Sequence, residues 1–309
     1  MGAGQLESIS KLPEEQMKHR DSSWSYSSHA EHELSLSLMK ELPSCYVNPR
    51  SIDAWRHERM YTTIAPLLQV DPNATWVTIG DGRFGSDAYF LIRHGINTMA
   101  TSLTDNTLTI AKRHGFIHEF KSINAENIAL PDNSYDYVLC KEACHHVPRP
   151  PIAIYEMLRV AKKAVILIEP QEENSKRLLR RPKDLIKKVV RKQKSTLFEP
   201  SGNYIFRISH HEITKMMTAI GYPTMATKRL NDFYHPRLAD KKYALLSFQT
   251  LATKLAIAVQ DALCFLKMLD FGLATIILFK VSPTANLVSV LKKHGYRVNS
   301  LPRNPYLQH

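Results

Sequence analysis

The sequence predicts an α/β fold: a doubly wound, mostly parallel sheet of seven strands with helices on both faces. Three observations support this prediction. Between residues 76 and 170, short β-rich runs alternate with stretches of helical periodicity. The runs at 135–140 (YDYVLC) and 164–170 (AVILIEP) are almost wholly apolar, as strands buried on both faces are. A glycine-rich turn directly follows the first run, at residues 80–85.

The individual elements follow from periodicity and from their end signals. Ser51 can cap a helix over 51–70, and the Pro150-Pro151 pair suits the first turn of another over 150–161. Gly95 and Gly115 end two further helices, and Asp105 or Thr104 is the natural N-cap of the second. The predicted strands are 76–80, 97–103, 120–124, 135–140, 164–170, 224–233 and 273–279, the last two closing the edge of the sheet, and the predicted helices are 51–70, 86–94, 106–115, 150–161 and 210–221.

These elements divide the chain into four parts. Residues 1–50 are a polar arm, expected to be partly ordered, and residues 51–172 are the core. Residues 173–222 are a basic insertion with a segment on the side of the substrate, and residues 223–309 hold the C-terminal strands and a tail.

Charge and cysteine content limit the functional classes. Of the net charge of +12, segment 176–194 contributes +9, from ten Lys/Arg and one Asp, so the basic character is local. The four cysteines show neither a disulfide pattern nor paired metal spacing, and no signal peptide precedes the chain, so a reducing cytoplasm is expected. His210-His211-Glu212 lacks the i, i+4 spacing of a zinc helix, so no metal site is predicted.

The turn Gly80-Asp81-Gly82-Arg83-Phe84-Gly85 has the Gly-x-Gly-x-x-Gly pattern of a nucleotide-binding loop. Glycine lets the backbone approach a ligand closely, and the following helix offers free N–H groups. A dinucleotide site also needs an acid about 20 residues further on, to hold ribose hydroxyls. Ser102 stands there instead, and Asp105 comes later, so a dinucleotide is disfavoured; a purely structural turn is the other alternative.

The residues downstream favour a different nucleotide. Residues 124–170 contain, in order, Asn124-Ala125-Glu126, Leu130-Pro131, Ser134-Tyr135-Asp136, His145-His146 and the run EMLRV at 156–160. This order resembles the class I S-adenosylmethionine-dependent methyltransferases, over about residues 55 to 170. The resemblance implies a Rossmann-like core and S-adenosylmethionine as the cofactor.

The resemblance also implies roles for single residues. Gly80, Asp81, Gly82 and Gly85 would line the methionine part of the cofactor, Ser102 would take the place of the ribose-binding acid with Asp105 as a substitute, and Asn124, Ala125 and Glu126 would lie against adenine. Lys141 would lie beside the cofactor at the carboxyl end of its strand. The acid often found in the first strand is Thr78 here, so a non-catalytic, methyltransferase-like scaffold is an open alternative.

Methyl transfer needs a positioned acceptor and, for a hydroxyl, a base. His145 and His146, next to Glu142, lie in the loop where such a base is expected, with His145 slightly preferred, and histidine ordinarily titrates near neutral pH, at about 6.5. Asn203, Tyr204 and Arg207 lie where the family builds its acceptor pocket.

The basic segment 176–194 has three interpretations, which bear on the acceptor. A solvated helical face is one interpretation, and recognition of a phosphorylated or lipid-linked acceptor, or of an anionic membrane, is another. RNA is a third, but CKEACHH at 140–146 lacks the Asn/Asp-Pro-Pro-aromatic motif of base-amine enzymes. The sequence therefore favours a small-molecule or sugar-type acceptor, with an RNA-directed methyltransferase as the alternative.

Overall fold

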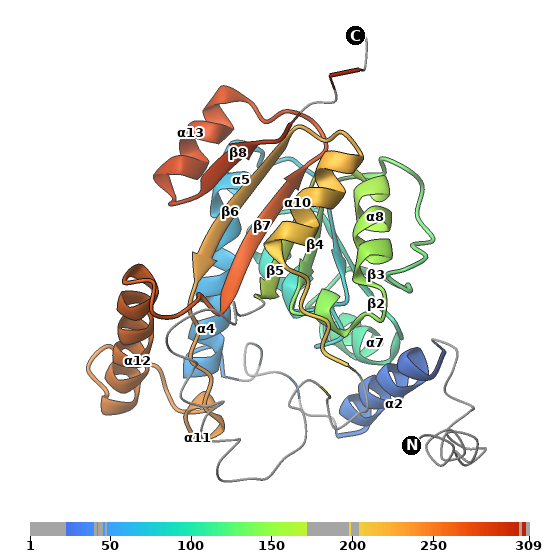
Figure 1. Cartoon of the computed structure of the whole chain (residues 1–309). Helices are drawn as coiled ribbons and strands as arrows, with labels where there is room; N and C mark the ends of the chain where they lie inside the picture. Colours follow the sequence, from blue (N-terminus) through green and yellow to red (C-terminus); the bar gives the residue numbers. More distant parts are fainter. Residues whose placement is uncertain are drawn as a thin grey trace, which may run out of the picture.

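A central sheet of eight strands runs through the molecule in the computed structural model (Figure 1). The structure describes residues 23–39, 42, 46, 48–171, 198, 204–302 and 305–306. The basic segment 176–194 and Asn203 lie outside these residues, so the predictions made for them are not addressed.

The strand order is β3-β2-β1-β4-β5-β7-β6-β8. Pairing is parallel from β3 to β5, and β7 is antiparallel to both of its neighbours. The strands are β1 (Trp76–Ile79), β2 (Thr98–Ser102), β3 (Glu119–Ser122), β4 (Tyr135–Lys141), β5 (Ala161–Pro170), β6 (Thr224–Leu230), β7 (Leu273–Phe279) and β8 (Arg297–Ser300). The predicted doubly wound α/β class is confirmed.

Two details of the predicted sheet are wrong. The sheet has eight strands rather than seven, because the polar residues 297–300 pair with β6 as an antiparallel edge strand. The strand at 273–279 does not close the edge; it lies between β5 and β6, which explains why all seven of its residues are buried.

Helices cover both faces of the sheet (Figure 1). On one face lie α8 (Pro150–Val160) and α10 (His210–Ala219), and on the other lie α4 (Ile52–Tyr61), α5 (Ala65–Val70), α6 (Ser86–Arg93) and α13 (Ala285–Lys293). The remaining helices are α2 (Ser23–Met39), η1 (Thr62–Ile64), α7 (Asn106–Arg113), η2 (Cys144–His146), α11 (Pro236–Ala239) and α12 (Phe248–Phe265). The predicted helix over 51–70 is thus divided into α4, η1 and α5, and Ser51 caps α4 by accepting from Ala54 N.

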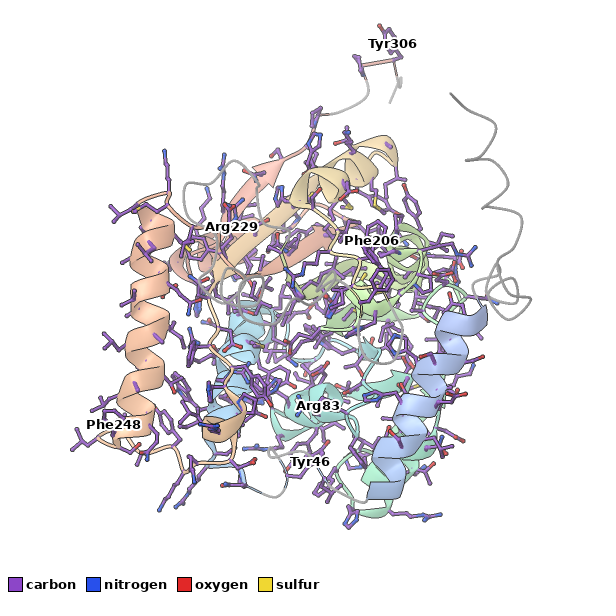
Figure 2. The ribbon with its side chains drawn as sticks, turned by 60° about the horizontal axis from the view of Figure 1, so that its bottom comes forward. Tyr46, Arg83, Phe206, Arg229, Phe248 and Tyr306 are labelled. Atoms are coloured by element: carbon purple, nitrogen blue, oxygen red, sulfur yellow. The ribbon has the colours of Figure 1, made fainter. Side chains whose placement is uncertain are left out.

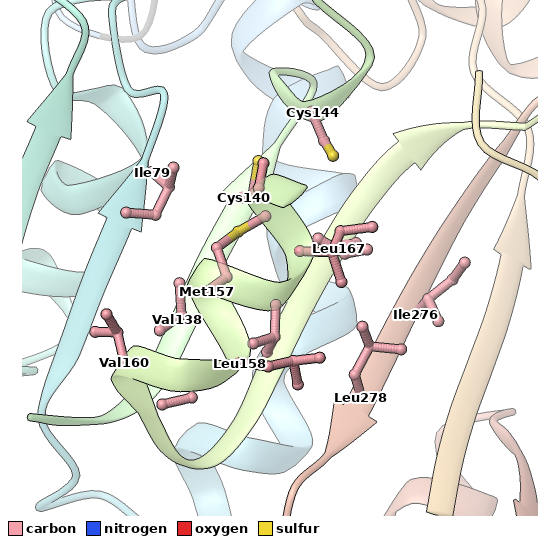
Figure 3. Packing of buried hydrophobic residues seen from close by; sticks show 14 of the residues in the cluster. Ile79, Val138, Cys140, Cys144, Met157, Leu158, Val160, Leu167, Ile276 and Leu278 are labelled. Atoms are coloured by element: carbon pink, nitrogen blue, oxygen red, sulfur yellow. The ribbon is translucent and has the colours of Figure 1, made fainter. Parts of the chain in front are cut away.

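Strand alternation builds two cores, because successive side chains of a strand point to opposite faces. Val138, Leu167 and Leu278 pack against Met157 and Leu158 of α8 (Figure 3). Their chain neighbours Leu139, Ile166 and Ile277 belong to the opposite core with α4, α5, α6 and α13. These two layers hold the carboxyl ends of the parallel strands in fixed positions.

None of the helices in the described ranges combines the length and the apolar character that a bilayer-spanning segment needs.

Candidate active site

A cavity of about 390 Å³ opens at the carboxyl ends of β1, β2 and β4. The strand order reverses between β1 and β4, and open α/β sheets bind their ligands at such a reversal. Seven of the predicted site residues line this cavity, namely Gly80, Gly82, Ser102, Asn124, Ala125, Glu142 and His146.

The glycine turn forms one wall of the cavity. Gly80 has a φ of +77°, and a Cβ there would lie 2.5 Å from Cβ of Ala143. A Cβ on Gly82 would lie 2.6 Å from Oε1 of Glu33 and 3.0 Å from Oγ of Ser102. Gly85, with a φ of +68°, faces Ile117 rather than the cavity. A side chain at Gly80 or Gly82 would therefore collide with other residues of the cavity wall, so glycine is what allows the turn to pack this closely against Ala143 and Glu33.

Asp81 turns away from the cavity. Its buried carboxylate accepts from the backbone N of Asp87 and Ala88 and from the Thr78 hydroxyl, so it fixes the beginning of α6. Burial and the nearby charge of Asp87 raise the pKa of Asp81 to about 7. Thr78 thus works together with Asp81, and the structure gives both a role in holding the turn.

Ser102, at the end of β2, binds a carboxylate that comes from another part of the chain. Its Oγ donates to Oε1 of Glu33 at 2.6 Å, and the backbone N of Thr104 donates to Oε2 of Glu33 at 3.0 Å. The Thr104 hydroxyl donates to the same Oε2. Glu33 belongs to α2, 69 residues before Ser102, and it lines the cavity. An acid therefore stands beside the end of β2, although β2 itself carries none.

Helix α2 contributes further residues to the cavity wall. Tyr26, His29, His32 and Glu33 all line it, and the first, second and fourth recur at the spacing of one helix face. Burial and the adjacent Glu126 raise the pKa of Tyr26 to about 12. These residues were not predicted as site residues, because the sequence marks them only as part of a polar, histidine-rich stretch in the N-terminal arm. In Figures 1 and 2, α2 lies across one end of the molecule.

The loop after β3 supplies the Asn124 and Ala125 part of the wall. Oδ1 of Asn124 accepts from the backbone N of Glu126 at 2.9 Å. The Glu126 carboxylate points elsewhere and accepts from N and Nε of Arg149, each at 2.7 Å. Glu126 is therefore buried, holds this loop through its hydrogen bonds with Arg149, and does not line the cavity.

Glu142 follows β4 with a φ of +50°, a conformation that non-glycine residues adopt only where the surroundings enforce it. Its carboxylate lies 3.2 Å from Nζ of Lys141 and 3.8 Å from Nδ1 of His57. Burial alone would raise its pKa, but the charge of Lys141 and the hydrogen bond from Lys141 lower the pKa of Glu142 to about 2. The cavity thus contains a permanently ionised carboxylate, while the buried Lys141 lies behind it, paired also with Asp87 at 3.5 Å.

The two adjacent histidines occupy different environments. His146 lines the cavity, and its ring lies edge-on to His29 of α2, with 5.3 Å between ring centroids. His145 is outside the cavity lining, and its Nδ1 lies 2.6 Å from Oε2 of the buried Glu169. The other oxygen of Glu169 accepts from the backbone N of Ala143 and Cys144. Glu169 therefore fixes this loop, and of the two histidines it is His146, not the preferred candidate His145, that lines the cavity.

The two predicted acceptor residues that the structure describes do not line the cavity. Tyr204 and Arg207 are exposed and do not line it. Phe206, between them, has its backbone N bonded to the His145 carbonyl at 2.8 Å (Figure 2). Asp105 occupies the N-cap position of α7, but its side chain makes no capping hydrogen bond and does not line the cavity. Arg83, which was not predicted as a site residue, does line the cavity.

A second cavity, of about 410 Å³, lies at the β6–β8 edge and is lined by Arg59, Arg229 and Arg297 among others. None of the predicted site residues lines it. Within the described ranges, no group of three or more His, Cys, Asp or Glu is arranged to hold a metal ion.

The part of the chain that carries this site matches a known protein family. Residues 77–168, from β1 to β5, match the family model of the methyltransferase domain. A search of curated protein sequences finds no match to the chain.

Several solved structures are similar to the chain at low identity. An S-adenosylmethionine-dependent methyltransferase of Thermotoga maritima is 18% identical, with 81% of this chain and 99% of that one covered and a TM-score of 0.45. The YcgJ protein of Bacillus subtilis is 16% identical, with coverages of 72% and 100% and a TM-score of 0.46. Magnesium protoporphyrin IX methyltransferase of Synechocystis, solved with bound S-adenosylmethionine, is 11% identical, with coverages of 73% and 79% and a TM-score of 0.41.

Proposed function

We infer from the methyltransferase domain at residues 77–168 that the chain is a class I S-adenosylmethionine-dependent methyltransferase, and we propose that it methylates a small organic acceptor in the cavity beneath α2. One observation carries the proposal. The cavity is bounded by the glycine turn on one side, by the His146 loop on another and by α2, so cofactor and acceptor would meet in one covered space. Its volume is in the range of small-molecule sites rather than of a groove for a polymer.

The residues of the cavity fit the cofactor. S-adenosylmethionine, when bound, supplies a methyl group on a positively charged sulfur. Gly80 and Gly82 leave the backbone approachable, Ser102 and Glu33 present polar oxygens at the end of β2, and Asn124 with Ala125 lies in the adjoining wall. The ionised Glu142 stabilises positive charge in the cavity, because carboxylates act over short distances in a partly desolvated site.

Glu33 takes the role that an acid after β2 would otherwise fill. Three donors, from Ser102 and Thr104, hold its carboxylate at the end of β2. An ionised carboxylate has about four acceptor positions, so one remains for a ribose hydroxyl. The absence of an acid at position 102 is therefore compensated from α2, and this supports an enzyme rather than a non-catalytic scaffold.

His146 is the group best placed to take a proton from a hydroxyl acceptor. It lines the cavity on the loop that follows β4, and Glu169 fixes that loop through Ala143 and Cys144. A sugar hydroxyl or a phenol is the acceptor class that needs such a base.

The test is methyl transfer from isotopically labelled S-adenosylmethionine to panels of phenols, sugars and sugar phosphates, with RNA as the competing class, followed by mass spectrometry. We expect labelled product from a small hydroxylated compound, and a loss of about 100-fold or more in kcat for His146→Asn. The matched control is His118→Asn, since His118 is exposed and outside the cavity. Labelling of RNA alone would contradict the proposal, and equal rates for His146→Asn and wild type would remove His146 as the base.

A further inference from the structure

Helix α12 exposes its apolar side. All seven residues of the helix that are exposed to solvent are apolar, namely Phe248, Leu251, Leu255, Ala258, Val259, Ala262 and Phe265. Of the four buried ones, two are threonines, Thr250 and Thr253. A surface helix of a globular protein normally shows the reverse arrangement.

Specific contacts hold α12 in this orientation. Nδ2 of Asn231 donates to Asp261 of the helix at 2.8 Å. Nζ of Lys254 lies 5.2 Å from the ring centroid of Tyr243 and 5.8 Å from that of Trp55. The polar residues of α12 therefore bind the rest of the protein, and rotation of the helix to bury its leucines would break these contacts.

The apolar surface is continuous. Phe248, Leu251, Leu255, Val259 and Ala262 follow one another at intervals of three or four residues, so they form one stripe along the helix. Leu245 and Leu246, before the helix, extend it, and the exposed fractions of Leu246, Phe248 and Phe265 are 89%, 82% and 77%. The helix is 18 residues long, about 27 Å, and Figure 2 shows Phe248 directed away from the rest of the molecule.

Basic residues border both ends of the stripe. Arg237, Lys241 and Lys242 precede α12 and are exposed, and Lys267 follows it and is exposed. The one exposed acid among residues 236–267 is Asp240, so the end before the helix carries net positive charge, while Lys267 at the other end is followed by the half-buried Asp270. Phe248 and Phe265 lie at the first and last positions of the helix.

We propose that α12 docks on an anionic lipid bilayer and lies in the plane of its headgroups. A stripe of Phe and Leu with flanking Lys and Arg is the pattern of helices that bind a membrane interface without crossing it. Acidic headgroups would pair with the basic residues at each end of the stripe. In Figure 1, α12 lies toward the end of the sheet to which β6 points, which is also the end where α2 lies.

The charges disfavour a second copy of the chain as the occupant. In an antiparallel pair of α12 helices, Lys241 and Lys242 of one copy would approach Lys267 of the other. In a parallel pair, the N-terminal ends of the two helices, each preceded by Lys241 and Lys242, would meet. Both arrangements bring cations together around an apolar interface, at an electrostatic cost that an anionic surface does not have.

The test is cosedimentation of the full chain with vesicles of phosphatidylcholine and phosphatidylglycerol, and with vesicles of phosphatidylcholine alone. We expect binding to the anionic vesicles, weakened by about 100-fold or more in the triple variant Leu246→Ser, Phe248→Ser, Leu255→Ser. Lys241→Gln with Lys242→Gln should weaken binding by about 10-fold or more, since each lysine near an anionic surface contributes about 1 kcal/mol. The matched control is Ile220→Ser with Val281→Ser, two exposed apolar residues outside α12, which should bind like wild type.

Calorimetric titration with S-adenosylhomocysteine shows whether each variant is folded, since α12 does not line the cavity. Failure of the wild type to bind anionic vesicles, or equal binding by the triple variant, would overturn the proposal. So would self-association without lipid that the triple variant abolishes, because α12 would then be an interface between copies.

Discussion

At the scale of single residues, the cavity depends on two carboxylates that reach it in different ways. Glu142 comes from the chain directly after β4 and is kept ionised by Lys141. Glu33 comes from α2 and is held by Ser102 and Thr104. Both provide negative charge next to the glycine turn, which suits a cofactor that carries a positively charged sulfur.

The role of Glu33 can be tested by moving its carboxylate. We predict that Glu33→Gln weakens S-adenosylhomocysteine binding by about 10- to 100-fold, the value of a hydrogen bond to a charged group. Ser102→Asp added to Glu33→Gln should recover most of this affinity, because the carboxylate then stands on β2 itself. Glu31→Gln, an exposed acid of the same helix, is the control and should bind like wild type. Unchanged calorimetric affinity of Glu33→Gln would show that the carboxylate does not touch the cofactor.

His57 gives a prediction for pH. Burial and the charge of Lys141 lower its pKa to about 3, so folded His57 is neutral at pH 5, whereas in the unfolded chain it protonates near pH 6.5. The stability that depends on neutral His57 is therefore complete above pH 6.5 and is lost as the pH falls toward 3.

Between pH 7 and pH 5, wild type should lose about 1–2 kcal/mol of unfolding free energy that His57→Gln does not lose. Urea unfolding at the two pH values measures this difference. His118→Gln, at an exposed position, should keep the wild-type pH dependence. Parallel losses in wild type and His57→Gln would contradict the assigned pKa.

At the scale of elements, α10 shows how a local signal fixes a boundary. Oγ of Ser209 accepts from the backbone N of Glu212, and the Glu212 carboxylate accepts from the backbone N of Ser209. This capping box begins the helix directly after the segment in which Phe206 binds the His145 carbonyl. The cap thus lies three residues after Phe206, whose backbone N–H supports the active-site loop.

Ser209→Ala should lower the unfolding free energy by about 1 kcal/mol, because one helix N–H loses its acceptor. Thermal unfolding would show this as a decrease of about 2 °C in Tm. Ser27→Ala, at an exposed position inside α2, is the control and should leave Tm unchanged. An unchanged Tm for Ser209→Ala would mean that the capping box does not contribute to stability.

The elements also show what sequence can predict. The ends of β1 to β5 and of α6 to α8 were predicted to within three residues, because apolar strands and glycine stops act locally. Helix α12 was not predicted, and the exposure of its apolar stripe could not be, because periodicity shows that a helix has an apolar face but not whether that face is buried. β8 was read as part of the tail, since an edge strand needs little apolar character and its partner β6 lies far away in the sequence.

At the scale of the whole molecule, the strand order places the site. The reversal between β1 and β4 brings the glycine turn, the end of β2 and the His146 loop to one edge of the sheet. Seven of the residues that the sequence motifs single out line this cavity. The motifs could not predict the contribution of α2, because Glu33 and Ser102 are joined by tertiary packing alone.

The central claim is that the glycine turn and α2 enclose the S-adenosylmethionine site. Its most direct test is calorimetric titration of S-adenosylhomocysteine into wild type, Gly82→Val and the control Gly95→Ala, a glycine with a φ of +77° and no atom near its Cβ position. We predict binding by wild type and by Gly95→Ala, and none by Gly82→Val, because the valine side chain would collide with Glu33 and Ser102. Equal affinity of Gly82→Val and wild type, or no binding by wild type, would contradict it.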